Sequence, residues 1–420
     1  MPFQTTQMNE DEMNRRDFLW MTALGAAGWL LAACQPDRDA GGDSTAEEKS
    51  STNEEQNMQK KLVFVGAYTA NLGFVDGKGK GIAAYWFDPL TGGLEHAATL
   101  EGQENPSFLV VHPDGKHLYA VNETAQFRGM KGGAVSALEF DRSTGSLKLL
   151  NQQPSFGAAP CHISLDRSGK YALVANYSSG SLAVYPLQPD GSLGEATDLV
   201  QHSGKGPDPN RQEGPHAHFI LTDPTNAFAL ACDLGLDQVL VYRFDLESGR
   251  LFPHDEPFAS LHPGAGPRHL AFHPGGKYVY VINELDATLT GFAWDGKKGS
   301  LRTIETVSTL PEGVAGPKSC AEIQVHPNGR FVYGSNRRHD SIVIFRIDEG
   351  SGRLTLVGHE STQGKTPRFF CFDPAGKFLL AANQDSSTVV TFRLDAETGK
   401  LTATGVKAEV PTPVCLAFAA

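Results

Sequence analysis

The stretch HPGGKYVYVINE at residues 273–284 decides how this chain folds, because close variants of it recur along the sequence. Each variant combines a tight turn, a short apolar strand, and an Asn or Asp followed by one more residue that is polar in most copies. The variants are HPDGKHLYAVNE (112–123), DRSGKYALVANY (166–177), DPTNAFALACDL (223–234), HPNGRFVYGSNR (326–337) and DPAGKFLLAANQ (373–384). Their starts lie roughly 47 to 57 residues apart, as in propeller blades with about four strands each. The repeat predicts an all-β fold, a β-propeller.

Two further markers give the number of blades. A turn of the TG-x-L type occurs seven times, at residues 91, 144, 190, 248, 298, 351 and 398. An apolar strand opening also occurs seven times, at residues 105, 159, 214, 266, 319, 366 and 412. The body starts at residue 61 on the second strand of a blade, and Thr412–Phe418 supplies the missing first strand. We therefore expect seven blades, closed by pairing of the C-terminal strand with the N-terminal strands, which removes free sheet edges.

Composition and charge narrow the class of partner. The chain of 420 residues contains 45 Gly and 25 Pro, as expected where many short strands need tight turns. Its net charge of −12 argues against a nucleic-acid partner, because no basic stripe is present to pair with phosphates.

The first 34 residues have the pattern of an export signal. Arg15 and Arg16 precede an apolar stretch that ends in LAAC at Cys34, which is similar to a twin-arginine signal with a bacterial lipobox. The alternative is a transmembrane anchor, for which the apolar run is short. Residues 35–60 are polar and acidic and are predicted to be a disordered linker. We therefore expect lipidation at Cys34, contact with the membrane through that lipid, and a propeller domain at 61–420 facing the periplasm in the cell envelope.

The cysteines do not indicate a metal site. No CxxC pair or Cys/His cluster has zinc spacing, so we predict neither a metal nor another cofactor. Five cysteines lie in the propeller, and four of them sit on equivalent strands of different blades, too far apart for disulfides. We expect them to be small buried apolar residues, at Cys161, Cys232, Cys320, Cys371 and Cys415.

Alternating strand direction sorts the polar residues onto two faces. The first-strand openings and the loops between second and third strands emerge on one face, around the channel, where ligands bind. That face should collect Asn105, His162, His216, His218, Arg268, His269, Glu322, Arg368, Glu123, Asn176, Asp233, Glu284, Arg337, Arg338 and Gln384. The other face should collect turn residues such as Asp114, Lys116, Lys277 and Lys377, together with His112, His273 and His326, for which we expect structural roles.

Several of these candidates leave alternatives open. His216 and His218 alternate along a strand, so both are expected to point to the same side, and either can be the acid/base group. Arg268, if buried, needs an anionic partner, and Glu284 is the nearest expected one. Arg337 and Arg338 occupy equivalent places, and one of them can be a surface residue.

With these residues in hand, the segments GPHAH (214–218), GPRHL (266–270), NEL (283–285) and NRRHDS (336–341) resemble the seven-bladed β-propeller lactonase family. That family includes 6-phosphogluconolactonases and a carboxymuconate-cyclising enzyme. The resemblance covers about residues 61–420. It implies a metal-independent active site at His218 or His216, Arg268, Glu284, and Arg337 or Arg338.

The resemblance implies a lactonase acting on a sugar lactone or another acidic lactone, so the expected partner is a small-molecule lactone or organic acid. His218 or Glu284 would activate water, while Arg268 and Arg337 would bind the anion and the developing oxyanion. Further substrate contacts are expected from His162, Arg338, Glu322, Arg368 and Asn176. Two alternatives remain, a muconate-type lactonising cycloisomerase and a non-catalytic ligand-binding propeller of the envelope. Export also separates this chain from the cytosolic phosphorylated lactone, so fold and chemistry carry over more readily than substrate.

Overall fold

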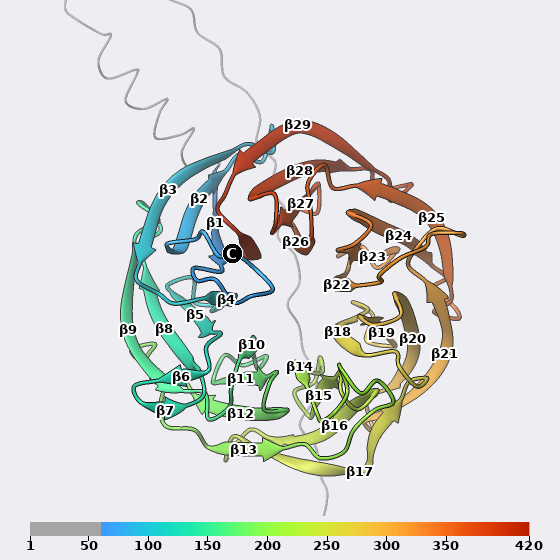
Figure 1. Cartoon of the computed structure of the whole chain (residues 1–420), viewed down its shortest axis with the longest axis horizontal. Helices are drawn as coiled ribbons and strands as arrows, with labels where there is room; N and C mark the ends of the chain where they lie inside the picture. The colour runs from blue at the N-terminus through green and yellow to red at the C-terminus, as the bar shows by residue number, and fades with distance from the viewer. Residues whose placement is uncertain (1–59, 420) are drawn as a thin grey trace, which may run out of the picture. The chain divides into compact units, whose positions relative to one another are not determined.

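The computed structural model describes residues 60–419. Seven four-stranded antiparallel sheets stand as blades around a central channel (Figure 1). The seven-bladed β-propeller predicted from the repeat is therefore confirmed. None of the helices in the described residues is long and apolar enough to cross a membrane.

Blades 1 to 4 occupy the first part of the ring. Blade 1 contains β1 (Lys61–Ala67), β2 (Gly81–Phe87), β3 (Leu94–Glu101) and β30 (Pro413–Phe418). Blade 2 contains β4 (Pro106–Val111), β5 (His117–Asn122), β8 (Ala134–Phe140) and β9 (Leu147–Pro154). Blade 3 contains β10 (Pro160–Leu165), β11 (Tyr171–Asn176), β12 (Ser181–Pro186) and β13 (Asp198–Gln201). Blade 4 contains β14 (Ala217–Thr222), β15 (Phe228–Asp233), β16 (Gln238–Asp245) and β17 (Arg250–Ser260).

Blades 5 to 7 complete the ring. Blade 5 contains β18 (Pro267–Phe272), β19 (Tyr278–Asn283), β20 (Thr288–Asp295) and β21 (Ser300–Ser308). Blade 6 contains β22 (Cys320–Val325), β23 (Phe331–Asn336), β24 (Ser341–Ile347) and β25 (Leu354–Ser361). Blade 7 contains β26 (Pro367–Phe372), β27 (Phe378–Asn383), β28 (Thr388–Leu394) and β29 (Leu401–Glu409). A small hairpin in blade 2 consists of β6 (Gln126–Phe127) and β7 (Met130–Lys131).

The C-terminal strand closes the ring. β30 pairs antiparallel with β1, with Val63 opposite Phe418 and Gly66 opposite Cys415. The two ends of the body thus form one blade, as the missing first strand near residue 61 predicted. Closure leaves no free inner edge at this seam, where an unpaired strand would expose its backbone donors and acceptors.

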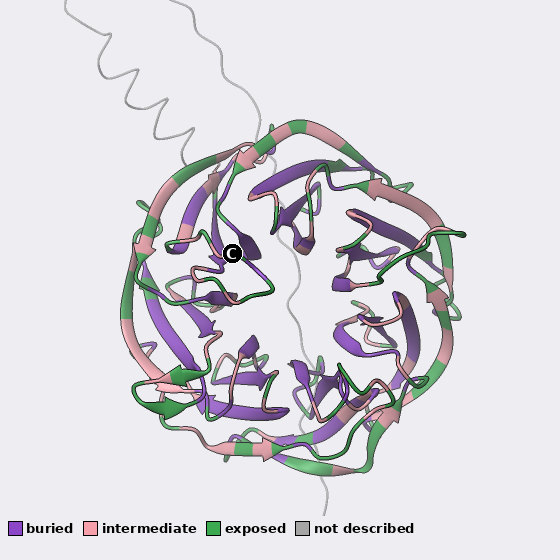
Figure 2. Ribbon diagram, viewed as in Figure 1, coloured by how far each residue is buried: buried purple, intermediate pink, exposed green. Residues whose placement is uncertain are grey.

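The core lies between the blades rather than within any one of them. The second strand of a blade, such as β11, is buried along its whole length, whereas the outermost strand, such as β9, has no buried residue and is half-buried or exposed throughout (Figure 2). A strand covered on both faces by neighbouring blades must be apolar at every position, which explains why the repeats carry continuous apolar runs. Aromatic contacts cross between blades, for example Phe64 with Phe140 at a ring-centroid distance of 4.8 Å.

The histidines of the turn face join neighbouring blades. The Nε2 atoms of His112, His273 and His326 lie 2.9, 2.8 and 2.9 Å from the carbonyl oxygens of Gly169, Gly329 and Gly376, each in the next blade. Gly169 is in the left-handed region at φ +69°, and a Cβ there would lie 2.7 Å from Nε2 of His112. These imidazoles therefore form the structural contacts expected of them, and the glycine leaves room for each contact.

Candidate active site

A β-bulge near the start of each innermost strand aims one side chain into the channel. In β18, Pro267 pairs with Asn283 and His269 pairs with Ile282, which leaves Arg268 unpaired between them. The same shift occurs in all seven innermost strands. In six of them it leaves a single residue out of register, namely Ser107, Cys161, His218, Arg268, Arg368 and Val414. Bulges commonly re-aim side chains beside active sites.

The residues that follow the bulges form a plug below this layer. The ring of His162 lies between those of Phe108 and Phe219, at centroid distances of 4.4 and 4.0 Å. The ring of His269 packs against Phe219 at 5.0 Å, and Phe369 packs against Phe108 at 5.6 Å. These five rings contact one another within the channel, and three of them, Phe108, His269 and Phe369, line the small space described below.

A second repeated contact places side chains around the mouth of this space. In every blade, the residue after the second strand donates its backbone N–H to the carbonyl oxygen just before the first strand. One example is Glu284 to Gly266 at 2.7 Å, and another is Arg337 to Ser319 at 2.8 Å. Several of the accepting residues adopt positive φ, which turns the chain sharply into the channel strand; they are Asn105, Ala159, Gly266, Thr366 and Thr412.

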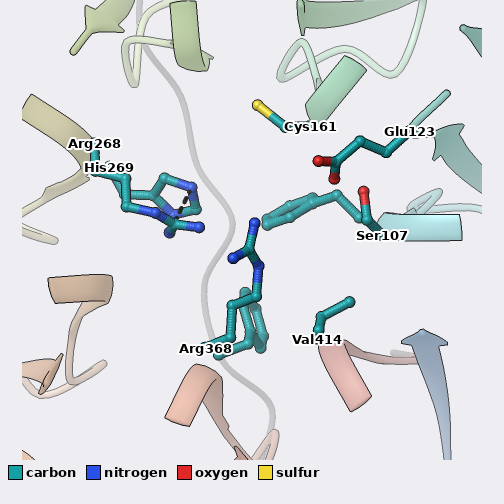
Figure 3. Close-up of a pocket in the computed structure, with 9 residues that line it drawn as sticks. Ser107, Glu123, Cys161, Arg268, His269, Arg368 and Val414 are labelled. Atoms are coloured by element: carbon teal, nitrogen blue, oxygen red, sulfur yellow. Dashed lines mark hydrogen bonds between the residues drawn. The ribbon is translucent and has the colours of Figure 1, made fainter. Parts of the chain in front are cut away.

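Above the plug lies a cavity of about 440 Å³. Its charged and histidine lining residues are Glu123, Arg211, His218, Glu284, Arg337, Arg338, Arg368 and Asp385. The remaining lining residues are Phe74, Ala159, Cys161, Tyr177, Ser178, Ser319, Thr366 and Gln384. A smaller space of about 10 Å³ lies between this layer and the plug, where Arg268, Arg368 and Glu123 converge (Figure 3).

Glu284 is the centre of an ionic cluster. One carboxylate oxygen, Oε1, lies 2.6 Å from Nη2 of Arg211. The other, Oε2, lies 2.7 Å from Nη2 of Arg337 and 3.2 Å from Nε of Arg268. The Arg268 contact has the length of an ion pair but not the angle of a hydrogen bond, because Nε of Arg268 has no hydrogen-bond partner within the described residues. Three guanidinium groups thus surround one buried carboxylate.

The charges in this cluster set its protonation. Burial alone would raise the pKa of Glu284, but Arg337, Arg268 and Arg211 hold it well below its usual range. Burial, with Arg337 and Arg368 nearby, lowers the pKa of Arg268 to about 10. At neutral pH the carboxylate is ionised and the arginine is charged, so the cluster has an excess of positive charge that faces the cavity.

His218 is neutral and lies close to this cluster. Burial, reinforced by Arg268, lowers the pKa of the imidazole well below 6.5. Its Nδ1 lies 3.7 Å from the thiol sulfur of Cys161, and its ring packs edge-on against Tyr177 at a centroid distance of 5.4 Å. A neutral imidazole in a cavity with developing negative charge has the protonation state needed for a general base.

Arg268 is held from below by a second buried carboxyl. Nη1 of Arg268 donates to the carbonyl oxygen of Ala321 at 2.7 Å and to Nε2 of His269 at 3.2 Å. Because an arginine only donates, Nε2 of His269 accepts, and its Nδ1–H donates to Oε2 of Glu322 at 2.9 Å. Burial outweighs Arg268 and raises the pKa of Glu322 to about 8.

A third group lies across the cavity. The Tyr68 hydroxyl donates to Oε2 of Glu123 at 2.9 Å and accepts from Nη2 of Arg368 at 2.9 Å. The Arg368 guanidinium also lies over the Tyr68 ring, 5.3 Å from its centroid. Burial, outweighing the effect of Arg368, raises the pKa of Tyr68, so this hydroxyl stays protonated. Tyr68 connects the two charged residues and orients both toward the cavity.

The structure brings most of the predicted residues together. His218, Glu284, Arg337, Arg338 and Arg368 line the large cavity, and Arg268 lines the small space beneath it. His216 and His218 were expected to point to the same side, and this is wrong, because the bulge at residues 217–219 interrupts the alternation. His216 lies just before β14 and stacks on Tyr177 at 4.7 Å.

Three of the expected substrate contacts lie elsewhere than in the large cavity. His162 is part of the plug, and Glu322 lies behind His269, so neither lines the large cavity. Asn176 is buried and donates from Nδ2 to the carbonyl oxygen of Ser155 at 3.0 Å. The recurrent Asn of the repeats is thus a tether within its blade, and the residue after it, here Tyr177, faces the cavity.

Sequence reasoning missed nine of the lining residues, among them Arg211, Phe74 and Tyr177. Arg211 comes from the longest of the connections between blades, residues 202–216, and Phe74 comes from the loop after β1. Tyr177 follows the repeated Asn, as Glu284 does, so its position in the repeat was an available signal. All five cysteines of the described region are buried and free, in agreement with the sequence prediction.

The turn face holds a small group with metal-ligand chemistry. Among the described residues, His112, Asp114 and His117 are close enough together to share an ion. Nδ1 of His112 accepts from the backbone N–H of Asp114 at 3.2 Å, and Nε2 contacts Gly169 in the next blade. His273 and His326 accept a backbone N–H in the same way, so His112 has the same turn role as they have.

The large cavity, lined by arginines, carboxylates and one neutral histidine, is typical of an enzyme site for a small molecule. The chain matches the family model described as "Lactonase, 7-bladed beta-propeller" over residues 62–418. A Bacillus subtilis protein named 6-phosphogluconolactonase is 37% identical over 317 residues, which cover 76% of this chain and 86% of that protein. A Formosa agariphila protein of the same name is 36% identical over 316 residues, or 74% and 86% of the two chains.

One solved structure adds a relative with a stated location. The periplasmic gluconolactonase of Pseudomonas aeruginosa, PpgL, is 33% identical, with a TM-score of 0.79, and the match covers 86% of this chain and 99% of that one. This chain belongs to the seven-bladed β-propeller lactonase family. It is therefore an enzyme of the lactone-hydrolysing class.

Proposed function

We propose that this enzyme opens a sugar lactone or another acidic lactone with water, and that His218 and the Glu284 cluster carry the reaction. The observation that supports this most strongly is a cavity of about 440 Å³ that is lined by the neutral imidazole of His218 and by Glu284, whose carboxylate holds three guanidinium groups. A six-membered sugar lactone fits a space of this size. The names of the relatives favour lactone opening over the lactone-forming reaction of a cycloisomerase.

In the proposed first step, Nε2 of His218 takes a proton from water as the water oxygen bonds to the lactone carbonyl carbon. The carbonyl oxygen becomes negative and is stabilised by N–H donors of Arg337 and Arg268. These donors do not need to reorient, because Glu284 and the backbone carbonyls of Cys320 and Ala321 already hold them. In the second step, the bond from the carbonyl carbon to the ring oxygen breaks, and the protonated His218 donates to that oxygen.

Glu284 has the electrostatic role in this scheme, and His218 has the basic one. A carboxylate held by three arginines is a weak base, because any proton it accepts must displace them. His218 has a lowered pKa and no ion-pair partner among residues 60–419, so its neutral form is available at neutral pH. This arrangement supports His218 rather than Glu284 as the proposed base.

We further propose that the enzyme works in the bacterial cell envelope, after export by the twin-arginine route and lipidation at Cys34. The support is the signal pattern in the first 34 residues and the periplasmic location stated for the Pseudomonas relative. Those residues, and the acidic linker at 35–59, lie outside the described region. Cys34→Ala should abolish incorporation of labelled palmitate, and unchanged labelling would contradict the lipoprotein assignment.

The function is tested with a panel of lactones. Purified enzyme is added to glucono-δ-lactone, its 6-phosphate, and muconolactone, and acid release is followed by titration at constant pH. The products are identified by NMR spectroscopy. We expect ring-opened hydroxy acids from the sugar lactones. Conversion of muconolactone to the open unsaturated diacid, with inert sugar lactones, would favour the cycloisomerase instead. No turnover of any lactone would contradict an enzymatic role on lactones.

A further inference from the structure

Arg211 reaches the Glu284 cluster from outside the repeat. Arg268 belongs to β18 and Arg337 directly follows β23, whereas Arg211 lies in the long connection between β13 and β14, residues 202–216. Every blade has such a connection, but this one, with 15 residues, is the longest, and the next longest, residues 309–319, has 11. Arg211 on it lines the cavity and is partly exposed. Arg211 therefore arrives at the cavity from the solvent side, and the other two arrive from the channel wall.

The neighbouring Gln212 fixes this connection. Its side chain is buried, and its Nε2 donates to the carbonyl oxygen of Leu234 and to Oδ1 of Asp237, both at 2.8 Å. Its Oε1 accepts the backbone N–H of Asp208 at 3.1 Å. A buried amide with these three hydrogen bonds holds the backbone at Arg211 in place, so the guanidinium is presented from a fixed base.

Arg211 uses only one of its nitrogens within the protein. Nη2 donates to Oε1 of Glu284 at 2.6 Å and to the Tyr177 hydroxyl at 3.2 Å. Nε and Nη1 have no hydrogen-bond acceptor within the described part of the chain. The side chain is 41% exposed, compared with 3% for Arg268 and 13% for Arg337. Three of its five N–H donors are thus available to a ligand.

The charge around Arg211 is not balanced by the protein. Glu284 is shared among three guanidinium groups, so its single negative charge leaves an excess of positive charge. The next acid along the chain, Glu213, lies 3.2 Å from Nε2 of His216 instead. A fixed guanidinium with free donors and uncompensated charge is well suited to bind an oxyanion, because little side-chain freedom is lost on binding.

Resting on the lactonase function proposed above, we propose that Arg211 is a specificity-determining residue that binds the anionic substituent of an acidic lactone. Its free donors hold a phosphate or carboxylate at the mouth, while Nη2 stays on Glu284. Arg268 and Arg337 act at the carbonyl end, deeper in the cavity. The charge of the substrate is thereby recognised by a residue of the β13–β14 connection, separately from the groups that stabilise the oxyanion.

Arg338 is the competing residue at the mouth. It lines the same cavity and has no ion pair within residues 60–419, but it is exposed and nothing fixes its guanidinium. A flexible exposed arginine loses more side-chain entropy on binding and is screened by solvent. We therefore expect Arg338 to contribute less to charge recognition than Arg211, and it serves as the matched comparison.

The experiment uses three lactones that differ at the terminal carbon: glucono-δ-lactone, its 6-phosphate, and a glucaric acid lactone with a carboxylate there. Values of kcat/KM are measured for the full-length enzyme and for Arg211→Gln, Arg211→Lys and Arg338→Gln. Calorimetry measures binding of the three ring-opened acids, which does not require turnover. Melting temperatures control for folding.

For Arg211→Gln we expect kcat/KM to fall about 10- to 100-fold more on the two acidic lactones than on the neutral one, because the loss on the neutral lactone reflects only the weaker hold on Glu284. Arg211→Lys should recover part of the loss, and Arg338→Gln should cost less than about fivefold on any lactone. Comparison of the 6-phosphate with the glucaric acid lactone shows whether Arg211 prefers a phosphate or a carboxylate.

Equal losses on all three lactones would overturn the proposal, because Arg211 would then only support Glu284. Unchanged kinetics on all three would overturn it as well. If the wild-type enzyme opens none of the lactones, the proposed function fails, and calorimetry decides the role of Arg211. If Arg211→Gln loses affinity, relative to wild type, only for the two ring-opened acids that carry a second anionic group, the proposal is supported. If the substitution changes the affinity for all three acids equally, the proposal is overturned.

Discussion

The two faces of the propeller are built from the same repeats, but they use them differently. On the turn face, the residue before the turn has one role in most blades, which is to accept backbone N–H groups of that turn, as His273 and Asp373 do. On the cavity face, the residue after the second strand makes the same backbone contact in every blade. Its side chain nevertheless changes from blade to blade, through Glu123, Tyr177, Leu234, Glu284, Arg337 and Gln384.

This difference separates the residues that build the fold from those that act on a ligand. Where side chain and contact both repeat, the residue stabilises the blade. Where the backbone contact repeats but the side chain varies, the fold fixes the position of the residue, and its side chain is available for binding or catalysis. Glu284 and Arg337 occupy two such positions in adjacent blades, which is why they meet at 2.7 Å. Substitutions on the two faces should therefore have separable effects on activity and stability.

The largest effect is expected at His218. His218→Gln keeps a polar side chain of similar size but cannot accept and return a proton, so kcat should fall about 10³-fold. The melting temperature should change little, because Nδ1 of His218 makes only a long contact to Cys161 at 3.7 Å. Steady-state kinetics and calorimetric melting measure the two quantities. A loss of less than about tenfold, with folding intact, would mean that another group is the base.

The next largest effect is expected on stability, at Glu284. Glu284→Gln leaves three guanidinium groups without their shared carboxylate and should cost about 3–5 kcal/mol of unfolding free energy. Glu322→Gln is the matched control, because the raised pKa of Glu322, about 8, makes it largely neutral at pH 7. That control should cost about 1 kcal/mol or less. Similar costs in urea denaturation would contradict the charge assignment of the two buried carboxyls.

A third expected effect is a loss of stability at acid pH, caused by the buried histidines of the cavity and the plug. Burial lowers the pKa of His162, His218 and His269 well below 6.5 in the folded protein, so the unfolded chain binds protons first. Stability should therefore fall as pH falls below 6.5, by about 1.4 kcal/mol per pH unit for each histidine, until the folded pKa is reached. Urea midpoints between pH 7.5 and 5.5 measure this slope.

His162→Phe sharpens the acid test. Its ring is packed between Phe108 and Phe219, so a phenyl group is tolerated. Glu322, whose pKa is raised to about 8, opposes the effect of one of the three histidines, so the net slope should decrease by about half. An unchanged slope would show that His162 does not stay neutral in the fold.

The smallest effect is expected on the turn face. His273→Ala removes the contact to the carbonyl of Gly329 and should cost about 1–2 kcal/mol of stability. Activity should stay within about twofold of wild type, because this histidine lies at the far end of the blade from the cavity. A large loss of turnover at unchanged stability would break the separation of the two faces.

The repeats made the architecture predictable. A six-fold recurring turn, strand and Asn fixed the blade boundaries, and the phase of the first and last strands predicted the β1–β30 closure. The same phase placed Glu284, Arg337 and Arg368 on one face, because alternate strand direction leaves little freedom. The blade boundaries, the ring closure and the face of each residue follow from the period and phase of the repeat, so the sequence alone predicted them.

The details of the site depend on features that break the period. Strand alternation put His216 and His218 on the same side, but one extra residue in the β-bulge separates them. The equivalent bulge in β18 turns Arg268 toward Glu284, and it places the neighbouring His269 in the plug. Arg211 lies in a connection that is longer than its equivalents between other blades, so its approach to Glu284 depends on tertiary packing that no local pattern encodes.

The central claim is that the varied positions of the cavity face carry lactone hydrolysis. It is tested most directly by comparing initial rates of lactone opening for Arg337→Lys and Lys277→Ala, one from each face, with melting temperature as a folding control. Arg337→Lys keeps the charge but loses the fork that contacts Glu284 and the oxyanion, so kcat/KM should fall about 10²-fold. Lys277→Ala should match wild type. Equal rates for the two variants, with both folded, would contradict the account.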